Sequence, residues 1–388
     1  MCNYKMRIAI IDITGRNAAQ YNPSLCNNLG KIEKSNEVVL LSPTLYENAE
    51  AFKWLKLITL VPQAINSSLG LGKRILRAIE VALNYLYIIF YILIRKPDAI
   101  HFQWLPFLEV IGGEQIVLRI IKFVSPKSHI FFTAHNLYPH NMSDGGKRKY
   151  DKRFRKVMKY IDGYMVHLDS SKAELSKTFG IATNRIFLTY HGIYKAKGYT
   201  PVVRSNDREK VKIIMYGYQT KYKGADILIE ALKLLPQSYL QKTESLIVGK
   251  SDMELYTQYK DQVATLNTTW INRFVSEDEL YKSIGESDLI LLPYRQITQS
   301  GVLLLALSYR KPILTSNLPS FRETLEGYPA DYFFESDSPE ALKEMLIRFI
   351  DNGIDVKKQI EIIEGLNEKY SWENTARSTM NAYRSFSE

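Results

Sequence analysis

The chain has 388 residues, of which 46% are hydrophobic and 24% are charged. This length exceeds the size at which a single hydrophobic core stops growing, so two domains are predicted, and the composition excludes a disordered chain. The net charge of +10 favours an anionic partner: a phosphate-rich ligand, an anionic membrane surface or a nucleic acid.

The N-terminal residues lead almost directly into an apolar run, residues 6–12, and show no pattern of a secretory signal. The only cysteines, Cys2 and Cys26, do not suggest a disulfide framework. A cytoplasmic location is therefore expected.

The first half of the chain alternates short apolar runs with helical stretches. This alternation is typical of a parallel sheet with helices on both faces, and it predicts a doubly wound domain over residues 1–196. The predicted strands cover residues 7–12, 37–42, 99–102, 129–134, 163–166 and 185–189, and helical spacing covers residues 68–94 and 109–124.

Two segments of this half bear on membrane binding. Residues 81–94 carry no charge, but they number fourteen against the roughly 20 that a spanning helix needs, so a buried or interfacial helix is favoured. In residues 147–159, eight of thirteen are Lys or Arg. A solvated helix face and a membrane or phosphate surface both remain open for this cluster. Its few aromatic residues argue against a nucleic-acid partner.

Residues 195–209, with mixed charges, Gly198 and Pro201, are predicted to be a linker. A second doubly wound domain is predicted over residues 210–370. Its strands cover residues 211–216, 244–248, 269–274, 289–293 and 312–315; its helices cover 225–235, 254–266, 277–284 and 302–308; a last helix covers 373–385. Two such domains facing each other across a cleft would bind ligands at the carboxyl ends of their strands.

Several common motifs are absent from the sequence. No Gly-x-Gly-x-x-Gly occurs, which disfavours a dinucleotide oxidoreductase. The stretch from Val248 to Ser251 resembles the end of a P-loop, but the position of its first glycine is Glu244. There is no Asp-x-Asp and no His-x-x-x-His, so no metal is expected.

The second domain holds the strongest positive signals. The loop from Gly217 to Gly224 leaves a predicted strand and enters a helix, and its Lys223 can place a positive charge on a diphosphate. An ordinary turn with an exposed lysine is the alternative. Further along, Ser300 is a good N-cap, so the amides of Gly301 and Val302 would form an anion-binding helix start.

In the first domain, His135 and Asn136 follow a predicted strand, where functional residues gather in such sheets. A structural histidine is the alternative. The predicted acceptor contacts are Gly15, His101, Asn136 and His191.

Five pieces of the sequence, in this order, resemble one family. They are Thr133-Ala-His-Asn136, Tyr190-His-Gly-Ile193, Tyr222-Lys-Gly224, residues 287–294, and residues 311–316 with Glu323. Together they resemble the nucleotide-sugar glycosyltransferases of the GT-B fold, and are most similar to glycosyltransferase family 4. The resemblance implies two Rossmann-like domains and a final helix, within residues 373–388, that crosses back to the first domain.

The resemblance also assigns roles. It implies that His135 contacts the transferred sugar and that Lys223 contacts the donor diphosphate. The full set of predicted donor contacts is Gly217, Tyr218, Lys223, Arg273, Phe274, Tyr294, Gln299, Ser300, Gly301, Val302 and Glu323.

Two departures from the family pattern concern the donor. An arginine found six residues before the lysine in many members is Gly217 here, and the usual pair of glutamates eight residues apart is missing from residues 297–305. The grip on the donor would then fall to Gln299, Ser300 and backbone amides.

The expected function is transfer of a sugar from a nucleoside diphosphate-sugar to a saccharide or lipid-linked saccharide in surface-glycan biosynthesis. Neither a metal nor another cofactor is expected, and the enzyme would work at the inner face of the cytoplasmic membrane. The alternatives are a GT-B epimerase, a phosphorylase-like enzyme, a non-catalytic glycan- or nucleotide-binding protein and, last, a nucleic-acid binder.

Overall fold

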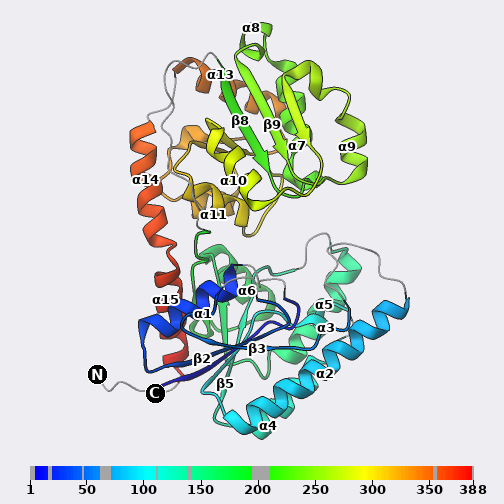
Figure 1. Cartoon of the computed structure of the whole chain (residues 1–388), viewed down its shortest axis with the longest axis vertical. Coiled ribbons are helices and arrows are strands. Elements are labelled where there is room, and N and C mark those ends of the chain that lie inside the picture. The colour runs from blue at the N-terminus through cyan, green and yellow to red at the C-terminus, as the bar shows by residue number, and fades with distance from the viewer. Residues whose placement is uncertain are drawn as a thin grey trace. The chain divides into compact units, whose positions relative to one another are not determined.

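The structure is a computed structural model that describes residues 5–15, 20–45, 48–61, 71–110, 112–138, 142–194, 210–352 and 356–386. The chain divides into two compact units (Figure 1). The first unit is Met1–Gly192 with Tyr370–Glu388, and the second is Ile193–Lys369. The predicted linker, residues 195–209, lies outside the described residues.

The first unit contains a seven-stranded parallel sheet with the strand order β3-β2-β1-β4-β5-β6-β7. Its strands are β1 Arg7–Ile11, β2 Glu37–Ser42, β3 Lys53–Lys56, β4 Ala99–Phe102, β5 His129–Thr133, β6 Gly163–Val166 and β7 Ile186–Leu188. Strand β3 was not predicted, because this four-residue edge strand is partly exposed and has no apolar run. The other six strands agree with their predicted positions to within a residue at either end.

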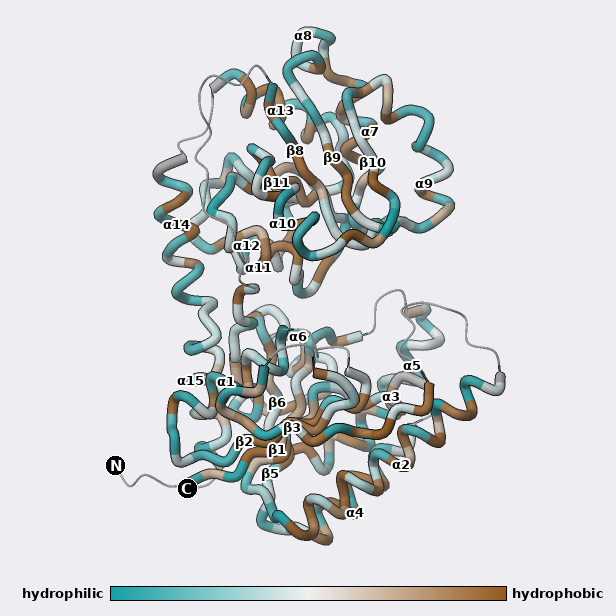
Figure 2. Tube along the Cα trace, in the orientation of Figure 1, coloured by the Kyte–Doolittle hydropathy of each residue, from teal (hydrophilic) through white to brown (hydrophobic). Residues whose placement is uncertain are grey.

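Helices cover both faces of this sheet. They are α1 Tyr21–Ile32, α2 Leu71–Arg95, α3 Pro106–Val110, α4 Glu114–Val124, α5 Asp144–Val157, α6 Asp169–Phe179 and α15 Trp372–Arg384. On one face, α2, α4 and α5 pack against alternate strand residues such as Ile130 and Phe132. Phe131, between them, points to the other face and contacts Tyr383 of α15, and α15 packs there against α1. Figure 2 shows the hydrophobic strands between these layers.

The second unit contains a six-stranded parallel sheet with the strand order β10-β9-β8-β11-β12-β13. Its strands are β8 Val211–Tyr216, β9 Thr243–Val248, β10 Thr268–Ile271, β11 Leu289–Leu292, β12 Ile313–Ser316 and β13 Phe333–Phe334. Its helices are α7 Ala225–Leu234, α8 Gln237–Leu240, α9 Met253–Tyr259, α10 Glu277–Glu286, α11 Gly301–Ser308, α12 Pro319–Thr324, α13 Pro339–Asn352 and α14 Val356–Lys369.

Two predicted elements of this unit need correction. The helix predicted over residues 254–266 is α9 followed by a separate 3-10 turn, Val263–Leu266. The strand predicted over residues 269–274 ends at Ile271, so Arg273 and Phe274 lie in the loop beyond it. The prediction of two parallel α/β sheets is confirmed.

In each sheet the strand order reverses beside the first strand, between β1 and β4 and between β8 and β11. Ligands of open α/β sheets bind in the crevice at the carboxyl ends of the strands at such a point. The residues that follow these strands are therefore the candidates for binding a ligand.

Candidate functional site

The ends of β8 and β9 come very close together through two glycines. Gly217, directly after β8, has φ +99°, and Gly249, directly after β9, has φ +129°. A Cβ added to Gly249 would lie 2.2 Å from the Gly217 carbonyl oxygen, which leaves no room for a side chain. Only glycine tolerates both the left-handed backbone and this approach. The result is a stretch of bare backbone at the carboxyl edge of the sheet.

Lys223 points its amine at this bare backbone. The residue ends the 3-10 turn Lys221–Lys223 and is only 7% exposed. A Cβ added to Gly217 would lie 2.7 Å from Lys223 Nζ, and Nζ lies 5.5 Å from the centre of the Tyr294 ring. Burial lowers the pKa of Lys223 from 10.5 to about 8.

No carboxylate pairs with Lys223 among the residues that the structure describes. A buried ammonium group is costly unless an anion compensates it. The geometry therefore suits a site that receives a negatively charged ligand.

A clamp holds the turn that carries Lys223. Arg295 donates two hydrogen bonds to Asp226, of 2.9 and 3.0 Å, and a third of 2.7 Å to the carbonyl of Lys221. Although burial raises the pKa of Asp226, hydrogen bonds and charge from Arg295 and Lys221 lower it on balance. This clamp was not predicted, because Asp226 and Arg295 are 69 residues apart in the sequence.

The start of α11 lies on the other side of Gly217. Ser300 Oγ accepts a hydrogen bond of 3.1 Å from the Leu303 amide, so the predicted N-cap is confirmed. The amides of Gly301 and Val302, in the first turn, have no hydrogen-bond partner among the described residues. A Cβ added to Gly217 would lie 3.3 Å from Val302 Cγ2. The lysine and the capped helix start thus meet at one glycine.

Tyr216 fixes this arrangement. As the last residue of β8, it donates a hydrogen bond of 2.8 Å from its hydroxyl to the Val302 carbonyl. The first turn of α11 is thereby tied to the strand that also leads into the lysine loop. A positive side chain and a helix N-terminus, held around bare backbone, can bind a diphosphate.

The remaining predicted donor contacts are placed less directly. Tyr218 donates a hydrogen bond of 3.0 Å to Asp252, and the buried Gln299 Oε1 has no partner among the described residues. Glu323 lies half-buried in α12, and no described contact joins it to Lys223. Their donor roles stay predictions.

Arg273 and Phe274 are also not joined to Lys223 by any described contact. The Arg273 guanidinium donates two hydrogen bonds, of 2.9 and 2.5 Å, to Glu279. The Phe274 side chain is exposed, with Lys250 Nζ 5.4 Å from its ring centre. Contact with a nucleotide base stays a prediction for both.

In the first unit, a glutamine and two histidines follow successive strands and form a chain of hydrogen bonds. Gln103 follows β4, His135 follows β5 and His167 follows β6. His135 Nε2 lies 3.0 Å from Gln103 Oε1, His135 Nδ1 lies 3.2 Å from His167 Nε2, and His167 Nδ1 lies 2.6 Å from the Thr189 carbonyl oxygen. The chain crosses the carboxyl edge of the sheet from β4 to β7.

The direction of these hydrogen bonds follows from charge. Burial, and then the nearby histidines, lowers the pKa of His135, while burial lowers the pKa of His167 to about 4. Both rings are therefore neutral at pH 7 and each carries one N–H. Because His167 Nδ1 must donate to the Thr189 carbonyl, His135 Nδ1 donates to His167.

The Gln103 amide must then present its nitrogen to His135 Nε2. This assignment also gives a partner to the buried Gln103 Nε2, which otherwise has none among the described residues. Both ring nitrogens of His135 are thus engaged within the unit.

Aromatic side chains surround the histidines. Tyr21 of α1 lies edge-on to three rings, with centroid distances of 5.0, 5.7 and 4.8 Å to His135, His167 and His191. Trp104 stacks on His135 at 5.1 Å, with 20° between the planes.

Trp372, the first residue of α15, lies 5.7 Å from His191 between ring centres. A Cβ added to Gly192 would lie 2.2 Å from the Trp372 ring, so the tryptophan fills the space that this glycine leaves. We name the set of Tyr21, Gln103, Trp104, His135, His167, His191 and Trp372 the ring cluster.

One predicted acceptor contact is wrong, and others remain open. His101 is 1% exposed, and its nitrogens lie 2.7 Å from the Tyr383 hydroxyl and 2.6 Å from Thr133 Oγ1, so it braces α15 against the sheet instead. Asn136 is half-buried, and its Oδ1 has no partner among the described residues. Gly15, with φ +65°, donates its amide to Asp12 Oδ1 at 3.0 Å.

In the described part of the chain no three His, Cys, Asp or Glu side chains are grouped like metal ligands.

Solved structures share this architecture along nearly the whole chain. Sucrose-phosphate synthase from Thermosynechococcus elongatus superposes with a TM-score of 0.71 at 15% identity, covering 98% of this chain and 99% of that one. Anabaena HepE, solved in complex with UDP, gives a TM-score of 0.68 at 12% identity, with 98% and 100% covered. The fold is therefore GT-B.

Sequence relatives narrow the class further. A GDP-mannose:glycolipid 4-beta-D-mannosyltransferase of Xanthomonas campestris is 23% identical over 260 residues, which are 63% of this chain and 70% of the relative. An uncharacterized glycosyltransferase of Methanocaldococcus jannaschii is 23% identical over 258 residues, 62% of this chain and 65% of the relative. Residues 195–365 match the family described as Glycosyl transferases group 1. The chain thus has the GT-B fold, and residues 195–365 are similar to the group 1 glycosyltransferases.

Proposed function

We propose that this enzyme transfers a sugar from a nucleoside diphosphate-sugar, bound by the second unit, to a hydroxyl of a saccharide or lipid-linked saccharide. The observation that carries the donor assignment is Lys223, a buried lysine that no described carboxylate neutralises, set beside the open amides of α11. We place the enzyme in glycosyltransferase family 4 and in surface-glycan biosynthesis as part of the same proposal.

The chemistry follows from where charge develops. The bond between the sugar C1 and the diphosphate oxygen breaks, and its electrons stay on the diphosphate. A new bond forms from C1 to the acceptor oxygen, and the proton of that hydroxyl passes to the leaving diphosphate or to water. Lys223 and the amides of Gly301 and Val302 would stabilise the leaving diphosphate, which gains negative charge in the transition state. These groups provide positive charge without a metal, and the proposal is that none is required.

The acceptor is proposed to bind at the carboxyl ends of the strands of the first unit. The ring cluster provides stacking surfaces for sugar rings there, and Asn136 provides a buried oxygen that has no partner within the described residues. His135 would orient the sugar through its ring face and edge, because its two nitrogens are held by Gln103 and His167. A glycolipid acceptor is supported by the named activity of the Xanthomonas relative.

The first experiment is a thermal-shift screen of the full chain against UDP, GDP and ADP and their sugars, with and without EDTA. A ligand that binds only the folded protein raises its melting temperature. We expect one nucleoside diphosphate to stabilise the protein, and EDTA to leave this shift unchanged. Loss of the shift in EDTA would contradict the metal-free site.

The second experiment incubates the enzyme with the selected donor, with and without a mixture of saccharide and lipid-linked acceptors. A transferase releases the nucleoside diphosphate much faster when the right acceptor is present. Conversion of the nucleotide sugar to its epimer without an acceptor would identify an epimerase instead. Binding of no nucleotide in the first experiment would point to a non-catalytic protein.

A further inference from the structure

The outer surface of α2 and α4 is strongly apolar. Most of the exposed large hydrophobic side chains among the described residues are on these two helices. On α2 they are Ile75, Leu76, Ile79, Leu83, Leu86, Tyr87, Phe90, Leu93 and Ile94, and on α4 they are Ile116, Ile120 and Phe123. Phe123 is 84% exposed and Phe90 61%. An apolar patch of this size on a surface marks a contact with another molecule or with a membrane.

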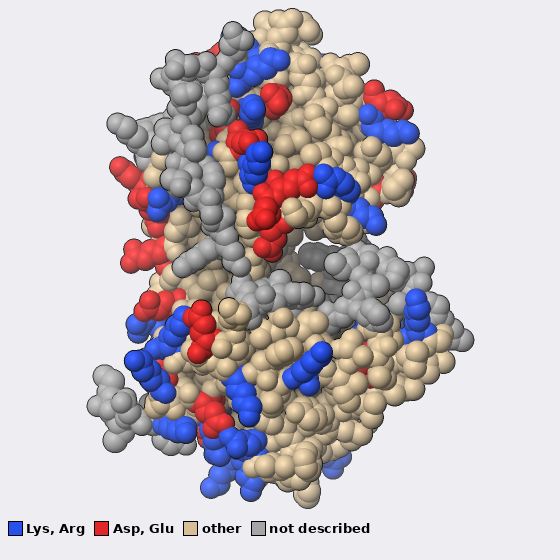
Figure 3. Space-filling view, in the orientation of Figure 1, with Lys and Arg blue, Asp and Glu red and all other residues tan. Residues whose placement is uncertain are grey.

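The exposed charges on these two helices have one sign. The only acidic residues of the two helices, Glu80 and Glu114, are buried, while Lys73, Arg74 and Arg119 are exposed. Figure 3 shows the surface over α2 as largely uncharged, with basic residues in small groups. A basic apolar face is complementary to an anionic apolar partner.

The same layer continues into the basic cluster of the sequence. Helix α5 packs beside α4, and α4 packs beside α2. Tyr150, Phe154 and Val157 of α5 face the core, while its lysines and arginines 147–149, 152, 155 and 156 are exposed. Apolar and basic surfaces are therefore continuous on one side of the first unit.

Helix α2 lies on its unit and does not leave it. By length and composition alone, residues Gly72–Arg95 could cross a membrane. However, Asn84 exchanges hydrogen bonds of 2.8 and 3.0 Å with the Ile58 backbone, and Glu80 accepts bonds of 2.7 and 2.9 Å from the amides of Leu60 and Val61. These hydrogen bonds fix one side of α2 to the first unit. The opposite side therefore points away from the unit and is available for contact with a membrane surface.

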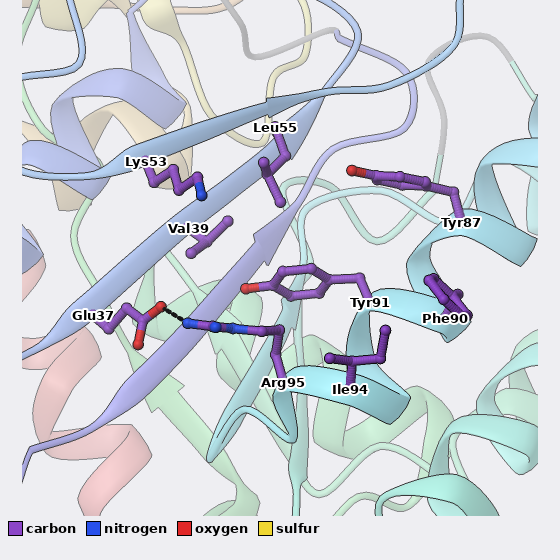
Figure 4. A pocket seen from close by; sticks show the side chains of 9 residues that line it. All are labelled: Glu37, Val39, Lys53, Leu55, Tyr87, Phe90, Tyr91, Ile94 and Arg95. Atoms are coloured by element: carbon purple, nitrogen blue, oxygen red, sulfur yellow. Dashed lines mark hydrogen bonds and ion pairs between the residues drawn. The ribbon is translucent and has the colours of Figure 1, made fainter.

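Two recesses adjoin the apolar face. One, of about 270 Å³, lies between the last turns of α2 and the edge strands, and Figure 4 shows its lining. Its apolar wall is formed by Val39, Leu55, Tyr87, Phe90, Tyr91 and Ile94. At the rim lie Lys53 and an ion pair between Arg95 and Glu37. The other, of about 400 Å³, is lined by Ile116, Ile120, Phe123 and Tyr160 with Arg119. Apolar walls with Lys53 at one rim and Arg119 at the other suit acyl chains below phosphate headgroups.

We propose that α2, α4 and α5 form a membrane-docking surface, in which the apolar face of α2 and α4 enters an anionic bilayer and α5 lies over its headgroups. Interfacial helices bind through buried apolar area together with attraction to anionic lipid. The fitting surface is the cytoplasmic leaflet, which carries anionic lipids. The proposal is independent of the donor site but would bring the enzyme to a lipid-linked acceptor.

The test is flotation of the full chain with vesicles, in the absence of donor and acceptor. One set of vesicles is phosphatidylcholine alone, and the other also contains phosphatidylglycerol. We expect strong binding to the anionic set and weak binding to the neutral set. No binding to either set, or equal binding to both, would overturn the proposal.

Point variants separate the two parts of the surface. Phe90→Glu and Phe123→Glu change exposed residues and should each weaken binding by about tenfold. Lys152→Gln and Lys156→Gln on α5 should each weaken only the anionic component, by about fivefold. The matched control is Met253→Glu, because Met253 is 65% exposed in the second unit and should leave vesicle binding unchanged.

A second copy of the chain is the competing occupant of the face. Analytical ultracentrifugation without lipid distinguishes it. If the chain is a dimer that Phe123→Glu dissociates, and if it does not bind vesicles, the apolar face is an interface between two copies and the proposal is overturned. A monomer that binds anionic vesicles supports it. Since no nucleotide is present, these outcomes are separate from the fate of the proposed donor site.

Discussion

In the second unit, the candidate donor site consists largely of backbone: two glycines with positive φ, the open amides of a helix start and one buried lysine amine. In the first unit, the ring cluster consists almost wholly of side chains that come from four strand ends and two helices. The second unit contains no histidine, whereas the first contains all six of the chain. One site is therefore poised for negative charge, and the other is kept neutral by burial.

The difference shows two ways of making a polar site within the same kind of sheet. A site made of amides and a lysine requires room for the ligand, and here glycine provides that room. A site made of buried rings requires partners for its nitrogens, and here His135 and His167 find them in each other, in the Gln103 amide and in the Thr189 carbonyl. Lowering the pH, removing the positive charge of Lys223 and adding a side chain at Gly217 should consequently affect the two units differently.

Acidification from pH 7 to pH 5 should destabilise the first unit and spare the second. Burial lowers the pKa of His101 and His191 to about 3 and that of His167 to about 4, below the ordinary 6.5. Below pH 6.5 these histidines take up protons in the unfolded chain but not in the folded unit. The free energy of unfolding is therefore undiminished above pH 6.5 and decreases as the pH falls. By pH 5 the loss is about 2 kcal/mol for each histidine.

Glu114 opposes part of this effect. Burial raises its pKa from 4.5 to about 7, so its contribution grows as the pH falls from 7 and offsets roughly 2 kcal/mol. The first unit should still lose several kcal/mol. Hydrogen exchange of the full chain, corrected for intrinsic pH dependence, would report each unit separately, and equal loss of protection in both would refute the prediction.

Removing the lysine charge should damage only the second site. Lys223→Ala is expected to lower kcat/KM by about 10²- to 10³-fold, because the leaving diphosphate loses a buried positive partner. Steady-state kinetics with the identified donor would measure this. The control is Lys233→Ala. Lys233 is a surface lysine in the last turn of α7, where its amine pairs with Glu230 at 2.8 Å. Equal activity of the two variants would exclude the proposed role of Lys223.

Adding one methyl group at Gly217 should reduce donor affinity by about tenfold, because it displaces the amine proposed to bind the diphosphate; its left-handed backbone should separately cost about 1–2 kcal/mol of stability. The new Cβ would also lie 2.7 Å from Lys223 Nζ and displace it. Gly327→Ala is the matched control, since Gly327 has φ +82° but nothing within 4 Å of an added Cβ. Calorimetric titration should show weaker nucleotide binding for Gly217→Ala alone.

Raising the pH should weaken nucleotide binding slightly. Because burial lowers the pKa of Lys223 to about 8, the amine loses its charge above that pH, whereas a bound diphosphate favours the charged form. Affinity should fall by about fourfold between pH 7 and pH 8.5. Titrations across this range would test it, with Lys223→Ala as the control that should show no such decline.

The second site could be predicted from sequence because each of its signals is local. A glycine loop after an apolar strand, a lysine within that loop and a serine before an apolar helix are all recognisable in short windows. The clamp that holds Lys223 was missed, because Arg295 and Asp226 come together only through the order of the strands.

The ring cluster shows the opposite limit. Its histidines could be selected because they follow predicted strands, but Tyr21 and Trp372 carry no local signal and meet them only in the folded unit. His101 was also assigned to the acceptor, although it lies within the predicted strand 99–102, and the sequence does not reveal which side of the sheet such a ring faces. By contrast, the helix predicted over residues 68–94 agrees with α2, Leu71–Arg95, within the described residues, because its amphipathic first turns carry a local signal.

The final helix also has a consequence for how the protein is made. Trp372 and the rest of α15 complete the first unit, although nearly all of that unit precedes the second in the sequence. Domains generally fold as units during synthesis, starting from the N-terminus. Here the first unit can be completed only after α15 has been synthesised, whereas the second unit has its whole sequence earlier and can finish first.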